Sequence, residues 1–335
     1  MDADISRDLY EFLARIAHRY YIDDRTQEEI AREFALSRPK VQRLLVQARR
    51  IGVVSIAIQA PPWLHLELED EFRAEFKLTD AIVSASPADP KSRREAVARS
   101  AAQYLERRLA KGTVVAVGHG RDTGEIPRFF RPAQRLECAF VSAMGGSTKV
   151  DAPTNPNEIC RALAERCGGR AESLYAPAYV ESAEMRDGLL QQEAIAHTLK
   201  LATQASVALV GIGGTDDECT MVRSGCLSVA EIGRLRGQGA VGDVLGNYVD
   251  IDGKPISSPH RNRLVALSLE DLRRIGTVVA VVSEAEKPPA ILGTLRAGAI
   301  DVLIVDETNA RAVLDLAHRG VSANTSPVDS MATRR

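Results

Sequence analysis

Short, continuously apolar runs rich in β-branched residues recur beyond residue 78, and stretches with helical spacing separate them. Such runs predict strands that are buried on both faces, as in parallel sheets with helices on each side. The strand-like runs cover residues 81–83, 114–117, 139–141, 207–210, 278–282 and 302–305. The helical patterns cover residues 93–109, 157–167, 185–203 and 289–297. This alternation predicts a doubly wound α/β domain.

The first fifty residues have a different pattern, that of three short helices. Apolar residues from Leu9 to Tyr20 recur every three or four positions, which predicts an amphipathic helix. Thr26 and Glu29 have the spacing of a capping box, so a second helix starts there. A short turn follows, and Ser37 is placed to cap a third helix whose inner face is Val41, Leu44, Leu45 and Ala48. This arrangement predicts a helix-turn-helix, whose third helix lies in the DNA major groove.

A stiff segment near residue 60 suggests the domain boundary. Residues 53–58 are β-branched and predict a strand, which Pro61-Pro62 ends. We therefore expect a helix-turn-helix DNA-binding domain over 1–60 and the α/β domain over 61–321. Residues 322–335 are polar and aperiodic, which predicts a disordered tail.

Four apolar residues just after this boundary recur every fourth position: Leu64, Leu68, Phe72 and Phe76. The spacing predicts a linking helix that packs either on the α/β domain or on a second subunit. We favour packing in the core of the same chain.

Composition excludes several classes of protein. No apolar run approaches the ~20 residues of a membrane span, and the acidic start lacks the order of a signal peptide, so we expect a cytoplasmic protein. The five cysteines form no CxxC pair and the six histidines no HExxH motif. These patterns indicate reduced core thiols, no metal site and no cofactor. Because the net charge is only −2, any affinity for DNA must be local.

The predicted third helix supplies that local charge. Residues 38–50 hold five basic side chains and no acidic one. We expect Arg38, Gln42 and Arg43 to contact base edges. We expect Lys40, Arg49 and Arg50 to contact phosphates. The predicted set is completed by three residues at the starts of the second and third helices: Thr26, Gln27 and Ser37. The alternative interpretation is a solvated helix face rich in arginine.

Two glycine loops directly follow apolar strands in the predicted sheet. They are Gly118–Gly120 and Gly145–Gly146. Backbone amides without side chains can approach an anion or a polyol closely at such positions. The alternative is a pair of ordinary tight turns.

The chain resembles the SorC family of bacterial sugar-binding transcription regulators along nearly its whole length. Near the start the resemblance lies in residues 20–21, 26–31, 36–38, 41–45, 48–49 and 52–54. In the large domain it lies in Val117–Arg121, Met144–Gly146, Leu174–Pro177, Gly211–Gly214, Gly239–Asp243 and the segment from Lys287 to Glu307.

The resemblance implies a sugar-binding effector and oligomerisation domain over 61–321, related in fold to sugar-phosphate isomerases and deaminases. It also implies a homotetramer, as a dimer of dimers, with double-stranded operator DNA and a sugar, sugar phosphate or polyol as partners. The effector-binding residues that it implies are Gly118, His119, Gly120, Arg121, Asp122, Thr123, Gly145, Gly146, Asn157, Asp243 and Lys287. Asp243 and Lys287 could instead form a structural ion pair.

Two acidic features depart from the family pattern. Asp122 stands where the family's first loop continues into threonine, and Glu284 lies in a segment before Lys287 where the family shows glycines. A carboxylate within ~5 Å of a phosphate repels it. We therefore hypothesise an unphosphorylated sugar or polyol, whose hydroxyl groups Asp122 and Asp243 accept.

The sequence thus predicts a transcription regulator of a carbohydrate or polyol catabolic operon. Its effector would shift operator affinity by a coupling free energy of about 1 to 3 kcal/mol. The direction of that shift is not encoded in any motif. The alternative is a sugar-phosphate isomerase or deaminase-like enzyme that uses Lys287 and Asp243.

Overall fold

The computed structural model describes residues 7–55, 64–146 and 152–323. The chain divides into two compact units, Met1–Ala60 and Pro61–Arg335. Most of the tail predicted at 322–335 lies outside the described residues.

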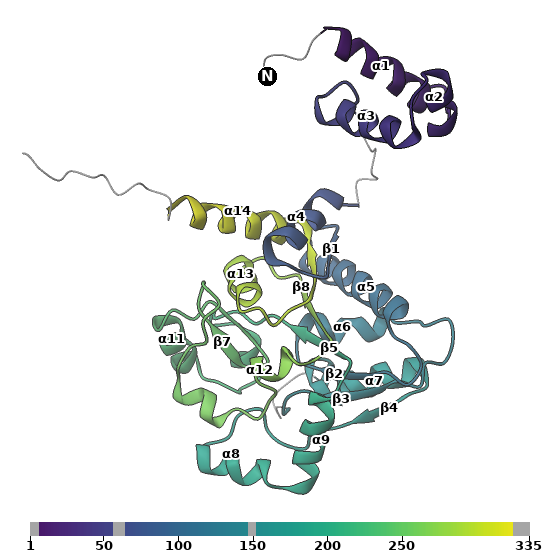
Figure 1. The fold of residues 1–335 in the computed structure, drawn as a ribbon. Helices are drawn as coiled ribbons and strands as arrows, with labels where there is room; N and C mark the ends of the chain where they lie inside the picture. Colours follow the sequence, from purple (N-terminus) through teal and green to yellow (C-terminus); the bar gives the residue numbers. More distant parts are fainter. Residues whose placement is uncertain (1–6, 56–63, 147–151, 324–335) are drawn as a thin grey trace, which may run out of the picture. The chain divides into compact units, whose positions relative to one another are not determined.

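The first unit is built from three helices (Figure 1): α1 (Arg7–Tyr21), α2 (Gln27–Glu33) and α3 (Arg38–Arg50). Their apolar faces meet in one small core whose buried members include Leu13, Ile16, Ile30, Val41, Leu44, Leu45 and Ala48. The inner face predicted for the third helix is therefore confirmed.

The start of α2 is a complete capping box, as predicted. Thr26 Oγ1 accepts a hydrogen bond from the amide of Glu29 at 3.3 Å, and Glu29 Oε2 accepts one from the amide of Thr26 at 2.9 Å. Ser37 takes the N-cap position of α3, but its side chain makes no capping hydrogen bond. The prediction for that hydroxyl is wrong, because the amide of Lys40 that it would accept donates to the Ser37 carbonyl instead, at 2.9 Å.

The strand predicted at 53–58 is wrong in its described part. Val53 and Val54 form a bend after α3, Ser55 belongs to no element, and residues 56–58 lie outside the described ranges. Val53 and Val54 pack on the three-helix core, and the Val54 amide donates to the carbonyl of Ala48 at 3.1 Å. Burial against the helices outweighs the β preference of these side chains.

The second unit is organised around a seven-stranded parallel sheet with the order β1-β9-β8-β5-β2-β3-β4. The strands are β1 (Asp80–Ser84), β2 (Val114–Val117), β3 (Ala139–Ser142), β4 (Arg170–Glu172), β5 (Val207–Gly211), β8 (Thr277–Val282) and β9 (Val302–Asp306). A separate antiparallel hairpin pairs β6 (Gly242–Val244) with β7 (Asn247–Val249).

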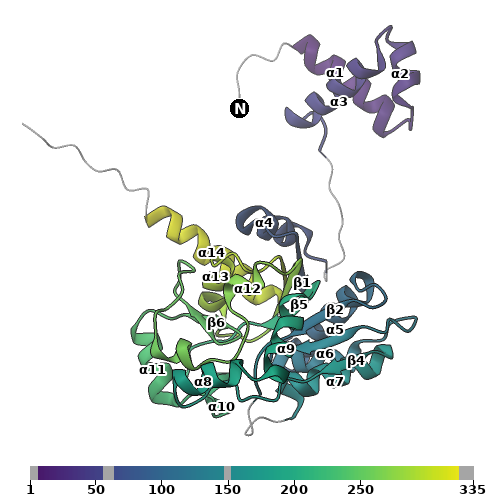
Figure 2. The same ribbon diagram turned by 60° about the horizontal axis from the view of Figure 1, so that its bottom comes forward.

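Helices cover both faces of the sheet (Figure 2), which confirms the doubly wound fold. On one face lie α5 (Pro90–Arg108), α6 (Arg121–Phe129) and α7 (Pro156–Cys167). On the other lie α4 (Leu66–Phe76), α9 (Glu193–Thr203), α13 (Pro288–Arg296) and α14 (Glu307–Ala323). Along β2, Val115 and Val117 enter the first core while Ala116 enters the second.

Shorter elements connect these layers. They are η1 (Ala152–Thr154), α8 (Ala183–Leu190), α10 (Thr220–Arg223), α11 (Val229–Gly237), η2 (Pro259–Arg263) and α12 (Leu269–Leu272). The single helix predicted at 185–203 is thus wrong, because the chain breaks at Gln191 and Gln192 into α8 and α9.

The linking helix predicted from the spacing of its apolar residues is α4. Phe72 is fully buried, and Leu68 and Phe76 pack on the same core beside β1 and α14. Leu64 precedes the helix and is 41% exposed. Packing within this chain is therefore confirmed for the last three of the four residues.

Four of the five cysteines are buried without a disulfide: Cys138, Cys160, Cys167 and Cys219. Within the described ranges, none of the helices combines the length and the apolar character that a membrane span requires.

Candidate functional site

The strand order reverses direction between β2 and β5. From β2 the chain continues outward to β3 and β4, whereas from β5 it continues to β8 and β9 on the other side. In open α/β sheets, ligands bind at such a switch point, beyond the carboxyl ends of the two strands. Here the two loops at that point are residues 118–120 after β2 and residues 212–214 after β5.

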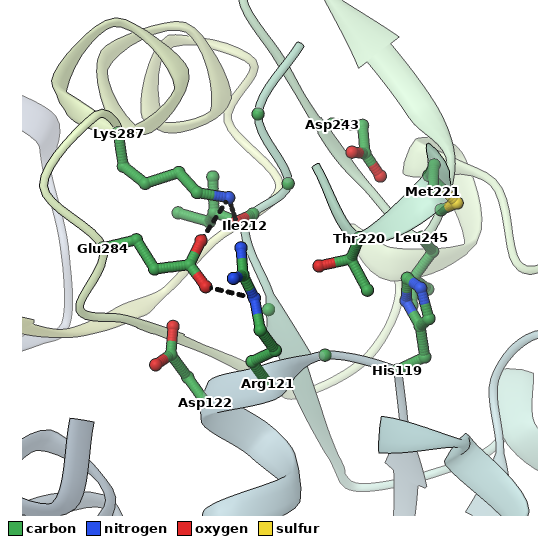
Figure 3. A pocket seen from close by; sticks show the side chains of 14 residues that line it. His119, Arg121, Asp122, Ile212, Thr220, Met221, Asp243, Leu245, Glu284 and Lys287 are labelled. Carbon is green, nitrogen blue, oxygen red and sulfur yellow. Dashed lines mark hydrogen bonds and ion pairs between the residues drawn. The ribbon is translucent and has the colours of Figure 1, made fainter. Parts of the chain in front are cut away.

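A polar cavity lies at this point (Figure 3). Most of its wall comes from the two loops, from α10 and from the segment before α13. The lining residues are His119, Gly120, Arg121, Asp122, Gly211, Ile212, Gly213, Gly214, Thr220, Met221, Asp243, Leu245, Glu284 and Lys287.

One side of the cavity holds two cations joined by one carboxylate. Glu284 Oε1 lies 2.6 Å from Arg121 Nε, and Glu284 Oε2 lies 2.9 Å from Lys287 Nζ. Lys287 is only 3% exposed and also donates to the carbonyl oxygen of Ile212 at 2.9 Å. Burial acts to raise the pKa of Glu284, but Lys287 and Arg121 outweigh it, so the pKa lies below its usual value.

Asp122 is buried and faces the end of β8. Its Oδ2 accepts the backbone amide of Ser283 at 3.1 Å, and its Oδ1 accepts the Ser283 hydroxyl at 2.5 Å. Arg94 of α5 lies 3.6 Å from the same Oδ1. Burial, and next the charge of Glu284, raise the pKa of Asp122 to about 6. Asp122 was predicted to accept ligand hydroxyl groups, but both of its carboxylate oxygens already accept hydrogen bonds from Ser283.

Asp243 has one engaged and one unpartnered oxygen. Oδ2 accepts the amide of Gly246 at 2.7 Å, while Oδ1 is buried with no hydrogen-bond partner among the described atoms. Burial raises the pKa of Asp243 to about 6, against the opposing effects of the Gly246 amide and Lys287. Gly213 exchanges backbone hydrogen bonds with Asp243, and a Cβ atom at position 213 would lie 1.9 Å from Oδ1.

His119 lies in the same half of the cavity as Asp243 and Thr220 (Figure 3). Its Nε2 atom is buried and, among the described atoms, has no hydrogen-bond partner. Burial lowers the pKa of His119 to about 4, so the ring is neutral at pH 7. The cavity therefore presents an unpartnered imidazole nitrogen and an unpartnered carboxylate oxygen.

The other predicted effector residues lie elsewhere. β2 and β3 are neighbours, but Gly146 and Asn157 line a separate open hollow. Asn157 Oδ1 accepts the Leu174 amide at 2.9 Å and the Ser142 hydroxyl, while Nδ2 donates to the Leu174 carbonyl at 3.3 Å. Asn157 therefore holds the segment at Leu174 in place.

Three more of the predicted effector residues have a structural role in close packing. A Cβ atom on Gly145 would lie 2.4 Å from the carbonyl oxygen of Pro177, and one on Gly118 would lie 2.5 Å from Leu245 Cδ2. Thr123 is fully buried and donates to the carbonyl of Gly120 at 3.1 Å.

Sequence reasoning missed several residues that line the cavity or support it: Gly213, Gly214, Thr220, Met221, Leu245 and Arg94. The glycines after the apolar run 207–210 carried a signal of the same kind as those after 114–117. Thr220, Met221 and Leu245 carried none, because tertiary folding alone brings α10 and the hairpin to the sheet.

In the first unit, the side chains predicted to contact DNA lie on the outer face of α3. Arg38, Lys40, Gln42, Arg43 and Arg49 are all exposed. Thr26, Gln27 and Arg38 line one open hollow at the start of α2, and Ser37 is exposed nearby in sequence.

The charges on α3 differ from those on α1. Arg19 of α1 pairs with Asp23 at 2.8 Å and with Glu33 at 2.9 Å. No ion pair between α3 and an acid occurs among the described residues of either unit. The outer face of α3 is therefore positive and available to a polyanion.

A helical module with such a face, joined to an α/β domain with a polar cavity at its switch point, defines the class of ligand-responsive transcription regulators. Residues 61–315 match the family described as "Putative sugar-binding domain". The chain belongs to the SorC family of sugar-binding transcription regulators.

The similar proteins cover nearly the whole chain. It is 32% identical to the transcriptional regulator LsrR of Klebsiella pneumoniae subsp. pneumoniae over 319 residues, with 92% of this chain and 94% of that one covered. It is 27% identical to the erythritol catabolism regulatory protein EryD of Brucella abortus, with 90% and 95% covered. The crystal structure of the full-length sorbitol operon regulator SorC from Klebsiella pneumoniae superposes with a TM-score of 0.71 at 25% identity, covering 92% of this chain and 100% of that one.

Proposed function

We propose that this protein controls a sugar or polyol catabolic operon by binding operator DNA through α3, with an affinity set by a small polyhydroxylated effector in the switch-point cavity. The observation that carries the proposal is the pair of buried, unpartnered polar atoms in that cavity, His119 Nε2 and Asp243 Oδ1. An unpartnered buried polar group costs about 1 to 3 kcal/mol, and a ligand hydroxyl would remove that cost.

A hydroxyl group suits both atoms because it donates and accepts at once. The ionised Asp243 oxygen accepts a hydroxyl proton, and the neutral His119 ring donates or accepts according to its tautomer. Gly213 packs against Asp243, since a Cβ atom there would lie 1.9 Å from Oδ1. A Cβ atom on Gly214 would lie 3.6 Å from Lys287 Nζ. The relatives named for erythritol and sorbitol regulation agree with a polyol or sugar as the effector.

On the DNA side, the roles follow from chemistry and position on α3. Arg38, Gln42 and Arg43 are assigned to base edges in the major groove, where guanidinium and amide groups pair with guanine and adenine. Lys40 and Arg49 are assigned to phosphates. Thr26, Gln27 and Ser37, at the starts of α2 and α3, are assigned to the phosphate backbone as well.

The effector acts in this proposal by changing the spacing of recognition helices within a homotetramer, arranged as a dimer of dimers. Paired half-sites on DNA require paired recognition helices at one fixed spacing, so a small rearrangement between subunits changes operator affinity. Sedimentation equilibrium tests the assembly, and a monomer at micromolar concentration would contradict it.

An enzyme acting through Lys287 and Asp243 has less support. Lys287 Nζ is occupied by Glu284 and by the carbonyl of Ile212, so the cavity offers an ion-paired lysine rather than a free amine. The relatives are named as regulators. Turnover of a sugar phosphate by the purified protein would favour the enzyme.

Two measurements on the full chain test the proposed function. A thermal-shift screen over sugars, polyols and their phosphates identifies binders, because any ligand of the folded state raises the melting temperature. Footprinting on the DNA upstream of its own gene, with and without each binder, then tests regulation. We expect at least one binder to change the footprint, and binders that never do so would contradict the proposal.

A further inference from the structure

Glu284 occupies the position that an anion would take in this cavity. Its carboxylate lies between Arg121 and Lys287 (Figure 3), at 2.6 Å and 2.9 Å. The Nη2 atom of Arg94 lies 4.0 Å from Oε1 of the same carboxylate. Arginine and lysine side chains that converge on one point are the usual partners of phosphate and carboxylate groups. Here the chain supplies that carboxylate itself.

Asp122 holds Glu284 in this position through Ser283. The backbone amide and the hydroxyl of Ser283 both donate to Asp122, so the backbone directly before Glu284 is anchored to the start of α6. Asp122 is 6% exposed, and Glu284 has a side chain that is 12% exposed. The two acids therefore act together, one as the anchor and the other as the bound anion.

The charges around the cavity are already balanced. Three cationic side chains (Arg94, Arg121 and Lys287) face three carboxylates (Asp122, Asp243 and Glu284). A phosphate group would add negative charge to a site of low dielectric constant, where like charges repel more strongly than in water. The unpartnered atoms in the other half, His119 Nε2 and Asp243 Oδ1, match hydroxyl groups instead.

We propose that Glu284 is a specificity-determining residue that fills the anion position of the cavity, so that the effector is an uncharged sugar or polyol and its phosphate ester is rejected. This proposal rests on the proposed function, in which the same cavity binds the effector. In this proposal, the Glu284 side chain, rather than the shape of the cavity, discriminates between an uncharged sugar or polyol and its phosphate ester.

The variant Glu284→Gln tests the proposal on the full chain. The amide has nearly the same shape but lacks the negative charge that competes with an added anion for Arg121 and Lys287. We expect titration calorimetry to show at least tenfold tighter binding of inorganic phosphate, and of sorbitol 6-phosphate, than in the unmodified protein. Glu286→Gln, an equal charge change at an exposed position two residues on, is the matched control and should show no gain.

Either of two results would overturn the proposal. One is inorganic phosphate binding that is equal in the unmodified protein and in Glu284→Gln, including no binding to either. The other is tighter binding of sorbitol 6-phosphate than of sorbitol by the unmodified protein, a result that needs no variant. Glu284→Ala replaces Glu284→Gln if the latter does not fold. Because phosphate binding is read without DNA, its outcome is separate from that of the footprint.

Discussion

The two units of this protein use charged side chains in opposite ways. On α3 the cations Arg38, Arg43 and Arg49 stand exposed, with no acidic partner among the described residues. In the switch-point cavity the cations are buried or half-buried and matched to carboxylates, as Lys287 is to Glu284. Exposed, unmatched charge suits a polyanion in water, whereas buried, matched charge suits a small neutral ligand. Variants that remove one charge from each unit therefore test the contrast directly.

The largest effect is expected from breaking the buried pair. Lys287→Met leaves Glu284 with one close cation in place of two, and removing one partner of a buried ion pair costs about 3 to 5 kcal/mol. Because Arg121 remains 2.6 Å away, we expect a loss near the lower end of that range. Scanning calorimetry measures it. The control Arg49→Met, at an exposed position, should change the melting temperature little. Equal stability of both variants would contradict the difference between buried and exposed charges.

A smaller effect is expected at the DNA surface, and it concerns binding rather than folding. Arg43→Ala should weaken binding to the operator by about 1 to 3 kcal/mol, the usual value of one bidentate contact to a base. Arg49→Ala on the same helix should instead weaken specific and non-specific binding alike, with a lower salt dependence. Gel-shift assays at two salt concentrations separate the two variants. Unchanged operator affinity of Arg43→Ala would remove that residue from base reading.

The smallest effect concerns pH. Burial gives Asp243 a pKa of about 6, and the ionised form accepts a ligand hydroxyl, so binding should weaken as protonation increases. Between pH 7 and pH 5 the ionised fraction falls roughly tenfold, and we expect the same fall in affinity for the best polyol in the screen. His119, with a pKa of about 4, stays largely neutral in this window.

Asp243→Asn separates this dependence from that of Asp122, whose pKa is also raised to about 6. The variant should bind the polyol more weakly at pH 7 and show a flatter profile by titration calorimetry. An unchanged profile in the variant would assign the titration to Asp122 instead.

Much of the fold could be predicted because its signals are local. The strands of the sheet centre are continuous apolar runs, and the Thr26 capping box fixes the start of α2. α6 escaped prediction because Gly124 and Pro127 obscure its helical pattern. The break between α8 and α9 escaped because Gln191 and Gln192 are tolerated inside helices as well as between them.

The site was less predictable than the fold because distant segments build it. His119, Arg121, Asp243 and Lys287 were expected together from a family resemblance, and the structure places them around one cavity. Asn157 was expected with them, yet its side chain accepts a hydrogen bond from the amide of Leu174. No local signal shows whether a polar side chain points into a cavity or toward its own backbone. The pairing of Asp122 with Ser283 spans 161 positions and has no sequence pattern.

The contact between Gly213 and Asp243 has a consequence for genetics. Every single-base change that gives Gly213 a side chain places a Cβ atom against the carboxylate, while α3 in the other unit keeps its sequence. Under the proposed function, such alleles should encode regulators that still recognise their operator but no longer respond to the effector. In a partial diploid strain, the proposed homotetramer would combine such subunits with normal ones. A selection for dominant mutants that do not respond to the effector should then recover substitutions at Gly213 repeatedly.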